Sequence, residues 1–131
     1  MKRYWDSSAL LEILDNSRLE KLSAEPNQWT RAHTLTEMFS TLTGGRLGFR
    51  FCPDDAAAII HEITARMNFV ELSARETLAA LDQAQRRGVR GGNVHDWMHA
   101  VAAKKAGAAV LLTCNLEDFK NAADGFAIEA P

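Results

Sequence analysis

The sequence has few of the residues that mark disulfide-rich or strongly basic proteins. Two of its 131 residues are cysteines, and Cys52 and Cys114 lie too far apart in the chain for a local metal-binding motif. We therefore expect two reduced thiols in the core rather than a disulfide framework. Lysine and arginine total 15 against 17 aspartates and glutamates, a formal net charge of −2. No overall basic field attracts nucleic acid, so such binding needs a local patch or a metal ion.

Long apolar runs are also lacking. No stretch is long enough to span a bilayer, and Asp6 stands where a signal peptide would be apolar. We therefore expect a cytoplasmic protein without a membrane anchor. The length and the hydrophobic share of 47% predict one globular domain over residues 1–131.

What the chain does contain is an alternation of short apolar strands and amphipathic helices. Strands are expected at residues 2–5, 28–32, 68–72, 108–113 and 126–128. Helices are expected after Ser7, before Pro26, from Thr34 to Gly44, from Pro53 to Met67, from Ser73 to Arg87, from Asp96 to Lys105 and near Phe119. This order predicts an α/β fold in three layers, α/β/α, with a central parallel sheet covered on both faces.

Apolar residues at helical spacing mark the helix faces that we expect to be buried. They include Met38, Phe39 and Leu42 in the helix that opens at Thr34, Ile60 and Ile63 in the next, Leu78 and Leu81 in the helix after Ser73, and Trp97 near Asp96.

Acidic and amide side chains follow two of the expected strands and begin two of the expected helices. Asp6 follows the first strand, and Asn115 and Asp118 follow the strand at 108–113. Because parallel strands share one carboxyl edge, these three side chains should lie near each other. Glu37 and Asp96 lie in the first turns of two helices, and the topology allows both helix starts to join that edge.

Clustered carboxylates repel one another, and their pKa values rise unless a cation neutralises the site. Mg²⁺ or Mn²⁺ typically takes one or two carboxylates and keeps several waters. Such an ion lowers the pKa of a bound water and holds a phosphate oxygen, which suits phosphodiester hydrolysis.

Each acid also has a purely structural interpretation. Glu37 with Thr34 fits a capping box, and Asp96 can favour the positive end of a helix dipole. Asp6 can cap the helix that begins at Ser7, and Asp118 can be a solvated loop acid. The combination is harder to explain this way, because all of them fall near one predicted edge.

Four segments in order resemble the PIN-domain family, and most closely bacterial toxins of the VapC kind: WDSSAL at 5–10, TLTE at 34–37, HDWMHAVA at 95–102 and LLTCNLEDF at 111–119. The resemblance implies a Mg²⁺- or Mn²⁺-dependent ribonuclease that forms a homodimer and is held inactive by an antitoxin protein. In that family, the positions of Asp6, Glu37 and Asp96 bind the metal, directly or through water. Ser8 matches a small hydroxyl residue that helps to shape the site.

The chain departs from the family pattern at the fourth acidic position. Many members carry Asp where this sequence has Asn115, and Asp118 stands three residues later. Asn115 can serve as a metal ligand through its carbonyl oxygen, and Asp118 can serve as the catalytic charge. The number of metal ions is left open by this departure.

Two further features near Asp96 have two interpretations each. Arg86, Arg87 and Arg90 can complement a helix dipole, or they can bind RNA phosphates beside the metal. His99 lies one turn beyond Asp96, where it can face the site, although helix surface or core packing is the favoured role.

Three alternatives to a toxin ribonuclease remain open. A PIN nuclease of RNA processing would lack an antitoxin gene next to its own. A catalytically inactive binding module, whose acids only cap helices, would not bind Mn²⁺. A phosphoryl-transfer domain usually has a Lys at a later strand end, where this chain has Thr113, Cys114 and Asn115.

Overall fold

The computed structural model describes residues 1–15, 20, 22 and 25–131. In this part of the chain, five parallel strands form one sheet in the order β3-β2-β1-β4-β5. The strands are β1 (Arg3–Trp5), β2 (Gln28–Thr30), β3 (Asn68–Phe69), β4 (Val110–Leu112) and β5 (Ala127–Glu129). The predicted strands are confirmed in position, and each is shorter than expected or moved by a residue.

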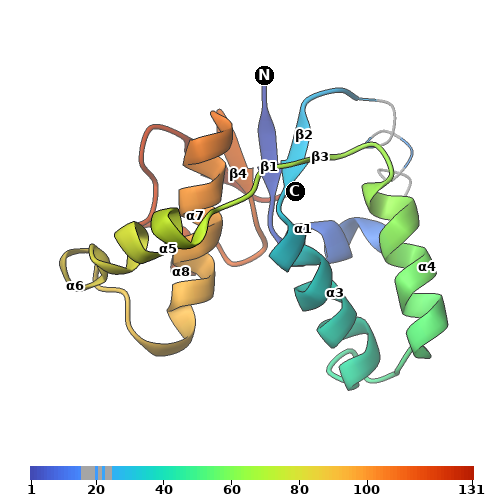
Figure 1. The fold of residues 1–131 in the computed structure, drawn as a ribbon. Helices are drawn as coiled ribbons and strands as arrows, with labels where there is room; N and C mark the ends of the chain where they lie inside the picture. The colour runs from blue at the N-terminus through green and yellow to red at the C-terminus, as the bar shows by residue number, and fades with distance from the viewer. Residues whose placement is uncertain (16–19, 21, 23–24) are drawn as a thin grey trace.

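The helices lie on the two sides of this sheet (Figure 1). They are α1 (Ser7–Glu12) with a 3₁₀ turn (Ile13–Asp15), α3 (Ala32–Gly44), α4 (Pro53–Thr64), α5 (Ala74–Leu81), α6 (Ala84–Arg87), a second 3₁₀ turn (Gly91–Asn93), α7 (Val94–Ala106) and α8 (Leu116–Phe119). The helix expected before Pro26 falls mainly on residues 16–19, 21 and 23–24, outside the described part.

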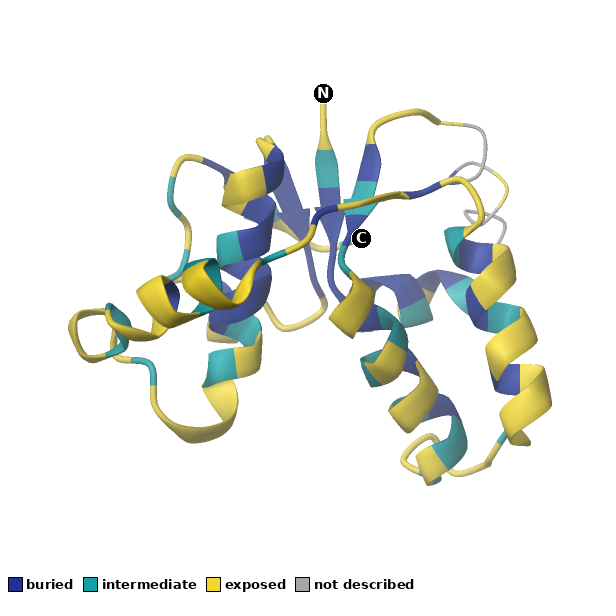
Figure 2. Cartoon of the chain, viewed as in Figure 1, coloured by how far each residue is buried: buried dark blue, intermediate teal, exposed yellow. Residues whose placement is uncertain are grey.

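Alternation along the two central strands divides the core into two halves. Tyr4 of β1 and Leu111 of β4 pack against α5, α7 and α8. Trp5, Val110 and Leu112 face the other way, onto α1, α3 and α4. Burying one large apolar side chain stabilises a fold by roughly 1.5–3 kcal/mol, so both faces hold the sheet in place. The predicted α/β/α layering is confirmed, and Figure 2 shows the buried residues concentrated at the sheet and the inner helix faces.

The register of β1 and β4 sets the position of the candidate site. Trp5 pairs with Leu112, and the Asp6 N–H donates to the Leu112 carbonyl at 3.1 Å. The residues that follow these two strands, Asp6 and Thr113, therefore leave the sheet side by side at its carboxyl edge.

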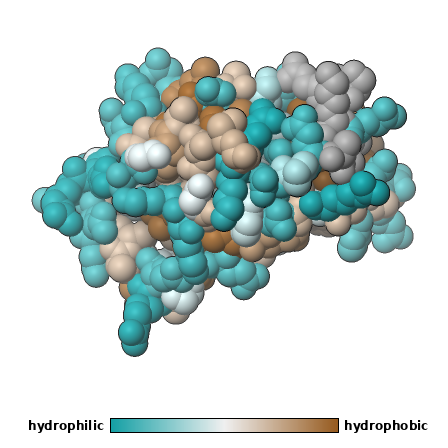
Figure 3. Space-filling view, turned by 90° about the horizontal axis from the view of Figure 1, so that it is seen from above, coloured by the Kyte–Doolittle hydropathy of each residue, from teal (hydrophilic) through white to brown (hydrophobic). Residues whose placement is uncertain are grey.

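The opposite end of the molecule is seen from above in Figure 3, toward the start of β1. That face is mainly hydrophilic, with hydrophobic side chains exposed between the polar ones. None of the described helices is long and apolar enough to cross a membrane.

The helix expected after Ser73 ends at Arg87 with Gly88 as its C-cap, as predicted. It is not continuous, because α5 stops at Leu81 and α6 begins at Ala84, and Leu78 and Leu81 are 62% and 42% exposed instead of buried. The reason is that α5 contacts α7 through Ala80, whose carbonyl accepts a hydrogen bond from the Trp97 Nε1–H at 3.2 Å. Because α5 packs against α7 through this small residue, both leucines face solvent.

Three smaller expectations also fail. Cys52 and Cys114 are free but exposed, because they lie at the start of α4 and in the turn after β4 rather than in the core. Phe39 is exposed on α3, whose buried face runs through Met38 and Leu42.

Candidate functional site

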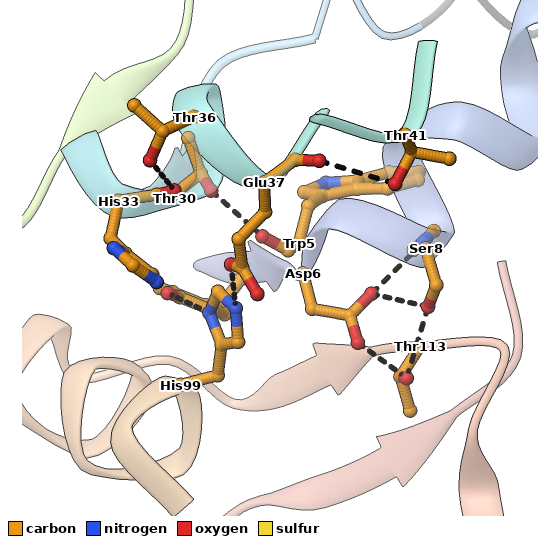
Figure 4. A network of polar contacts seen from close by, with 12 residues as sticks. Trp5, Asp6, Ser8, Thr30, His33, Thr36, Glu37, Thr41, His99 and Thr113 are labelled. Atoms are coloured by element: carbon orange, nitrogen blue, oxygen red, sulfur yellow. Dashed lines mark hydrogen bonds and ion pairs between the residues drawn. The ribbon is translucent and has the colours of Figure 1, made fainter. Parts of the chain in front are cut away.

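Asp6 is the most tightly held acid at the carboxyl edge. It is 2% exposed and caps α1, so the structural interpretation from sequence is confirmed. Its Oδ1 atom accepts hydrogen bonds from Ser8 Oγ at 2.7 Å and from the Ala9 N–H at 2.9 Å. Its Oδ2 atom accepts one from Thr113 Oγ1 at 2.6 Å, as Figure 4 shows. A carboxylate has about four lone-pair positions, and the described residues leave one on Oδ2 available.

Ser8 and Thr113 connect the ends of β1 and β4 through this carboxylate. Ser8 Oγ accepts from the Cys114 N–H at 3.0 Å, and Thr113 Oγ1 accepts from the Asn115 N–H at 3.0 Å. Each hydroxyl thus donates to Asp6 and accepts from the turn after β4. Thr113 was not among the site residues predicted from sequence, although its place at the carboxyl end of an expected central strand was a signal for it.

Glu37 lies in the second turn of α3, and its side chain extends toward His99. The predicted capping box with Thr34 is absent, because α3 begins at Ala32 and its N-cap, Arg31, makes no side-chain cap bond. Instead, Glu37 Oε1 accepts a hydrogen bond from His99 Nε2 at 2.6 Å (Figure 4). His99 is buried on α7 and its Nδ1 lies 2.8 Å from the Tyr4 hydroxyl.

The surroundings of Glu37 favour its charged form. Burial alone would raise the pKa of this carboxyl group. The hydrogen bond and charge of His99, together with the charges of His33 and Arg31, outweigh burial and lower the pKa below its ordinary value. Glu37 is therefore a carboxylate near neutral pH.

Asp96 is half-buried in the first turn of α7, and its surroundings disfavour its charge. Burial raises its pKa most, and the negative charges of Asp118, Asp6 and Glu37 raise it further, against an opposing contribution from His99. These three acids act on Asp96 because they lie near it at the same edge. The structure thus places Asp6 after β1, Glu37 on α3, Asp96 on α7 and Asp118 on α8 near one another at the carboxyl edge.

Asn115 and Asp118, the two candidates for the fourth acidic position, have different surroundings. Asn115 is exposed at the N-cap of α8 without a side-chain cap bond. Asp118 is exposed in the first turn of α8, and among the charges that raise the pKa of Asp96 it is the leading one. Asp118 is therefore the stronger electrostatic neighbour of the acidic edge.

The three arginines predicted as RNA contacts differ in their surroundings. Arg87 forms an ion pair with Asp124 at 3.5 Å and places its guanidinium 5.3 Å from the Trp97 ring centroid. It also shares the lining of a small cavity of about 90 Å³ with Asp118. Arg86 and Arg90 are exposed. Arg87 therefore holds α6 onto α7, and the other two face solvent.

A groove of about 970 Å³ runs beside the edge, between α1, α3 and α4 and the segment 46–51. Its apolar wall includes Phe49 and Phe51, whose rings meet edge to face at 5.4 Å between centroids. Ser8 and Asn115 lie at its border with the site. This groove was not predicted from the sequence.

The donor atoms at the edge suit a hard divalent cation, since they are carboxylate oxygens. Among the described residues, no three His, Cys, Asp or Glu side chains are arranged to hold one ion. Mg²⁺ binds through one or two carboxylates and keeps its remaining waters. The free position on Asp6 Oδ2 and the neighbouring charge of Asp96 fit that mode, and a cation there would relieve the repulsion that raises the pKa of Asp96.

Sequence comparison identifies the family. The PIN domain family matches residues 3–125, and the chain therefore belongs to it. PIN domains are generally nucleases. No curated protein sequence matches the chain.

Several solved structures share the fold at low sequence identity. PAE2754 from Pyrobaculum aerophilum has a TM-score of 0.72 and 17% identity, over 98% of this chain and 89% of that one. VapBC-1 from nontypeable Haemophilus influenzae gives 0.67 and 20%, over 99% and 98%. DNA-bound VapBC from Salmonella typhimurium gives 0.70 and 20%, over the same shares. These likenesses establish a PIN-like fold.

Proposed function

We propose that the protein is a Mg²⁺- or Mn²⁺-dependent endoribonuclease that acts in the cytoplasm as the toxin of a type II toxin–antitoxin pair. The observation that carries this proposal is the gathering of four acids, Asp6, Glu37, Asp96 and Asp118, around one sheet edge. Membership of a family of nucleases and structural likeness to two VapBC proteins support it.

In this proposal Asp6, Glu37 and Asp96 hold the ion, directly or through water. The bound ion supplies an activated water and stabilises negative charge on the phosphate. Asp118 is the fourth acid, because its charge acts most strongly on Asp96, and the Asn115 carbonyl oxygen is the alternative ligand at the end of β4. Ser8 shapes the site, since its hydroxyl is committed to Asp6 and the Cys114 N–H.

RNA approaches the edge from the side of α6. The exposed Arg86 and Arg90 contact its phosphates, and Arg87 contributes its charge while it stays paired with Asp124. Charge contacts of this kind bind the backbone without reading its sequence.

The protein partner is an antitoxin, and the toxin is a homodimer. The apolar groove that borders Ser8 and Asn115 gives an antitoxin a surface directly beside the site. A gene for a small protein next to this one, whose product co-purifies with the chain and blocks its activity, is expected. A PIN nuclease of RNA processing would lack this neighbour.

Incubation of the purified chain with a panel of structured RNAs, and with DNA of the same sequences, tests the reaction class. We expect cleavage of RNA with Mg²⁺ or Mn²⁺ and none with a chelator. Cleavage that survives chelation would contradict the metal mechanism. Preference for DNA would contradict the substrate, and the absence of both cleavage and Mn²⁺ binding would favour the inactive binding module.

A further inference from the structure

We propose that His99 is a positioning residue for the metal site, which fixes the orientation of the Glu37 carboxylate from behind. The inference rests on the proposed metal site and adds to it a residue that neither the acidic pattern nor the family membership assigns.

His99 is fixed by three separate elements. It is 1% exposed on α7, its Nε2 bonds to Glu37 of α3 at 2.6 Å, and its Nδ1 lies 2.8 Å from the Tyr4 hydroxyl of β1. The Tyr4 and His99 rings pack at 5.8 Å between centroids with planes 60° apart. With both ring nitrogens engaged and the ring buried, rotation would break two hydrogen bonds.

The proton positions follow from the partners. A carboxylate only accepts hydrogen bonds, so His99 Nε2 must carry a proton. The Tyr4 hydroxyl is a phenol that keeps its proton near neutral pH and can donate to Nδ1. A His99 ring protonated on Nε2 therefore satisfies both contacts, because Nδ1 either accepts from the Tyr4 hydroxyl or, when it also carries a proton, donates to it.

The contact with His99 fixes which oxygen of the Glu37 carboxylate faces the imidazole ring and which faces away from it. Its side chain extends from α3 toward the His99 ring (Figure 4), and Oε1 is taken by that contact. In the described part of the chain no hydrogen bond to Oε2 is found, which leaves this atom for a cation or a metal-bound water. A residue behind a metal-binding carboxylate fixes its geometry, and loss of such a partner typically costs 10–100-fold in metal affinity.

Calorimetric Mn²⁺ titration of the wild type, His99→Leu and His99→Gln tests the inference. Leu keeps an apolar side chain of similar bulk without a donor, whereas the Gln amide N–H can replace Nε2. We expect His99→Leu to weaken Mn²⁺ binding about tenfold or more, and His99→Gln to recover part of the loss. Thermal melts of each variant check that it is folded.

Two outcomes are distinguishable. A folded His99→Leu that binds Mn²⁺ as tightly as the wild type overturns the role of His99 and leaves the metal site standing. A wild type that binds no Mn²⁺ overturns the metal site, and the role of His99 with it.

A second measurement covers the case in which His99→Leu does not fold. In ¹⁵N-histidine spectra of the wild type, we expect Nε2 of His99 to carry a proton. In Tyr4→Phe, which keeps the ring and removes the hydroxyl, we expect weaker Mn²⁺ binding because the His99 ring loses one of its two hydrogen bonds, while Nε2 keeps its proton against Glu37. A wild-type His99 protonated on Nδ1 alone, or Tyr4→Phe with unchanged Mn²⁺ affinity, contradicts the proposal.

Discussion

Asp96 carries a charge that its surroundings disfavour. Its folded pKa is raised by burial and by Asp118, Asp6 and Glu37. A raised carboxyl pKa contributes stability below the unfolded pKa, and this contribution is lost as pH rises through the folded pKa. At neutral pH the charge of Asp96 therefore destabilises the folded, metal-free protein.

We expect Asp96→Asn to raise the melting temperature of the metal-free protein at neutral pH. The gain should shrink as pH falls through the raised pKa toward the ordinary carboxyl range, because the wild-type group is then protonated too. The matched control is Asp124→Asn, since Lys104 lowers the pKa of that carboxyl by a hydrogen bond and by its charge, and its loss should not stabilise. A destabilised Asp96→Asn at neutral pH would show that the charge is not disfavoured.

Asp6 lies at the same edge, but we expect its replacement to destabilise the protein, whereas replacement of Asp96 should stabilise it. Its carboxylate accepts three hydrogen bonds, and loss of an N-cap alone costs about 0.5–2 kcal/mol. Buried donors without partners cost about 1–3 kcal/mol each. We expect Asp6→Ala to lower the free energy of unfolding by about 2 kcal/mol or more in urea titrations, and Asp6→Asn by less, because the amide oxygen still accepts. Equal losses for both variants would contradict this.

The acids could be predicted from sequence, and their partners could not. Asp6 and Asp96 are marked by their places next to a strand end and at a helix start. The hydrogen bonds that hold the site join residues far apart in the chain, with 62 positions between Glu37 and His99 and 107 between Asp6 and Thr113. Such pairs depend on how the elements pack, which local patterns do not specify.

At the scale of elements, helical spacing groups residues onto one face but does not say which face is covered. It identified Met38 and Leu42 correctly on α3. It failed for Leu78 and Leu81, since α5 meets α7 through Ala80. The parallel sheet followed from the alternation of strands and helices, whereas the strand order β3-β2-β1-β4-β5 emerged only from the structure.

The end of α7 provides a prediction at this scale. Gly107 has φ of +75° and closes the helix, and a Cβ there would meet no atom within 4 Å. Gly107→Ala should therefore destabilise through the left-handed backbone alone, by about 1–2 kcal/mol. Gly92→Ala is the control, since it has equal space and no positive φ. Urea unfolding of both variants checks this, and equal effects would contradict it.

At the scale of the whole molecule, the proposed homodimer needs an apolar surface. α5 presents the exposed Leu78 and Leu81 three positions apart on one helix, and contiguous exposed apolar surface marks protein interaction sites. We expect the wild type to sediment as a dimer and the Leu78→Ser/Leu81→Ser double variant as a monomer. The control, Leu116→Ser, changes an exposed leucine on α8 and should stay dimeric. A wild type that is monomeric at high concentration would contradict the dimer.

The central claim is that the acidic side chains at the carboxyl edge of the sheet hold the metal ion that RNA cleavage requires. Its most direct test is the rate of RNA cleavage measured across a Mn²⁺ titration for the wild type, Asp96→Asn and Asp124→Asn. We expect the wild type and Asp124→Asn to respond alike to Mn²⁺, and Asp96→Asn to stay inactive at every concentration while its melting curve shows a folded protein. Mn²⁺-dependent cleavage by Asp96→Asn at the wild-type rate would contradict the account.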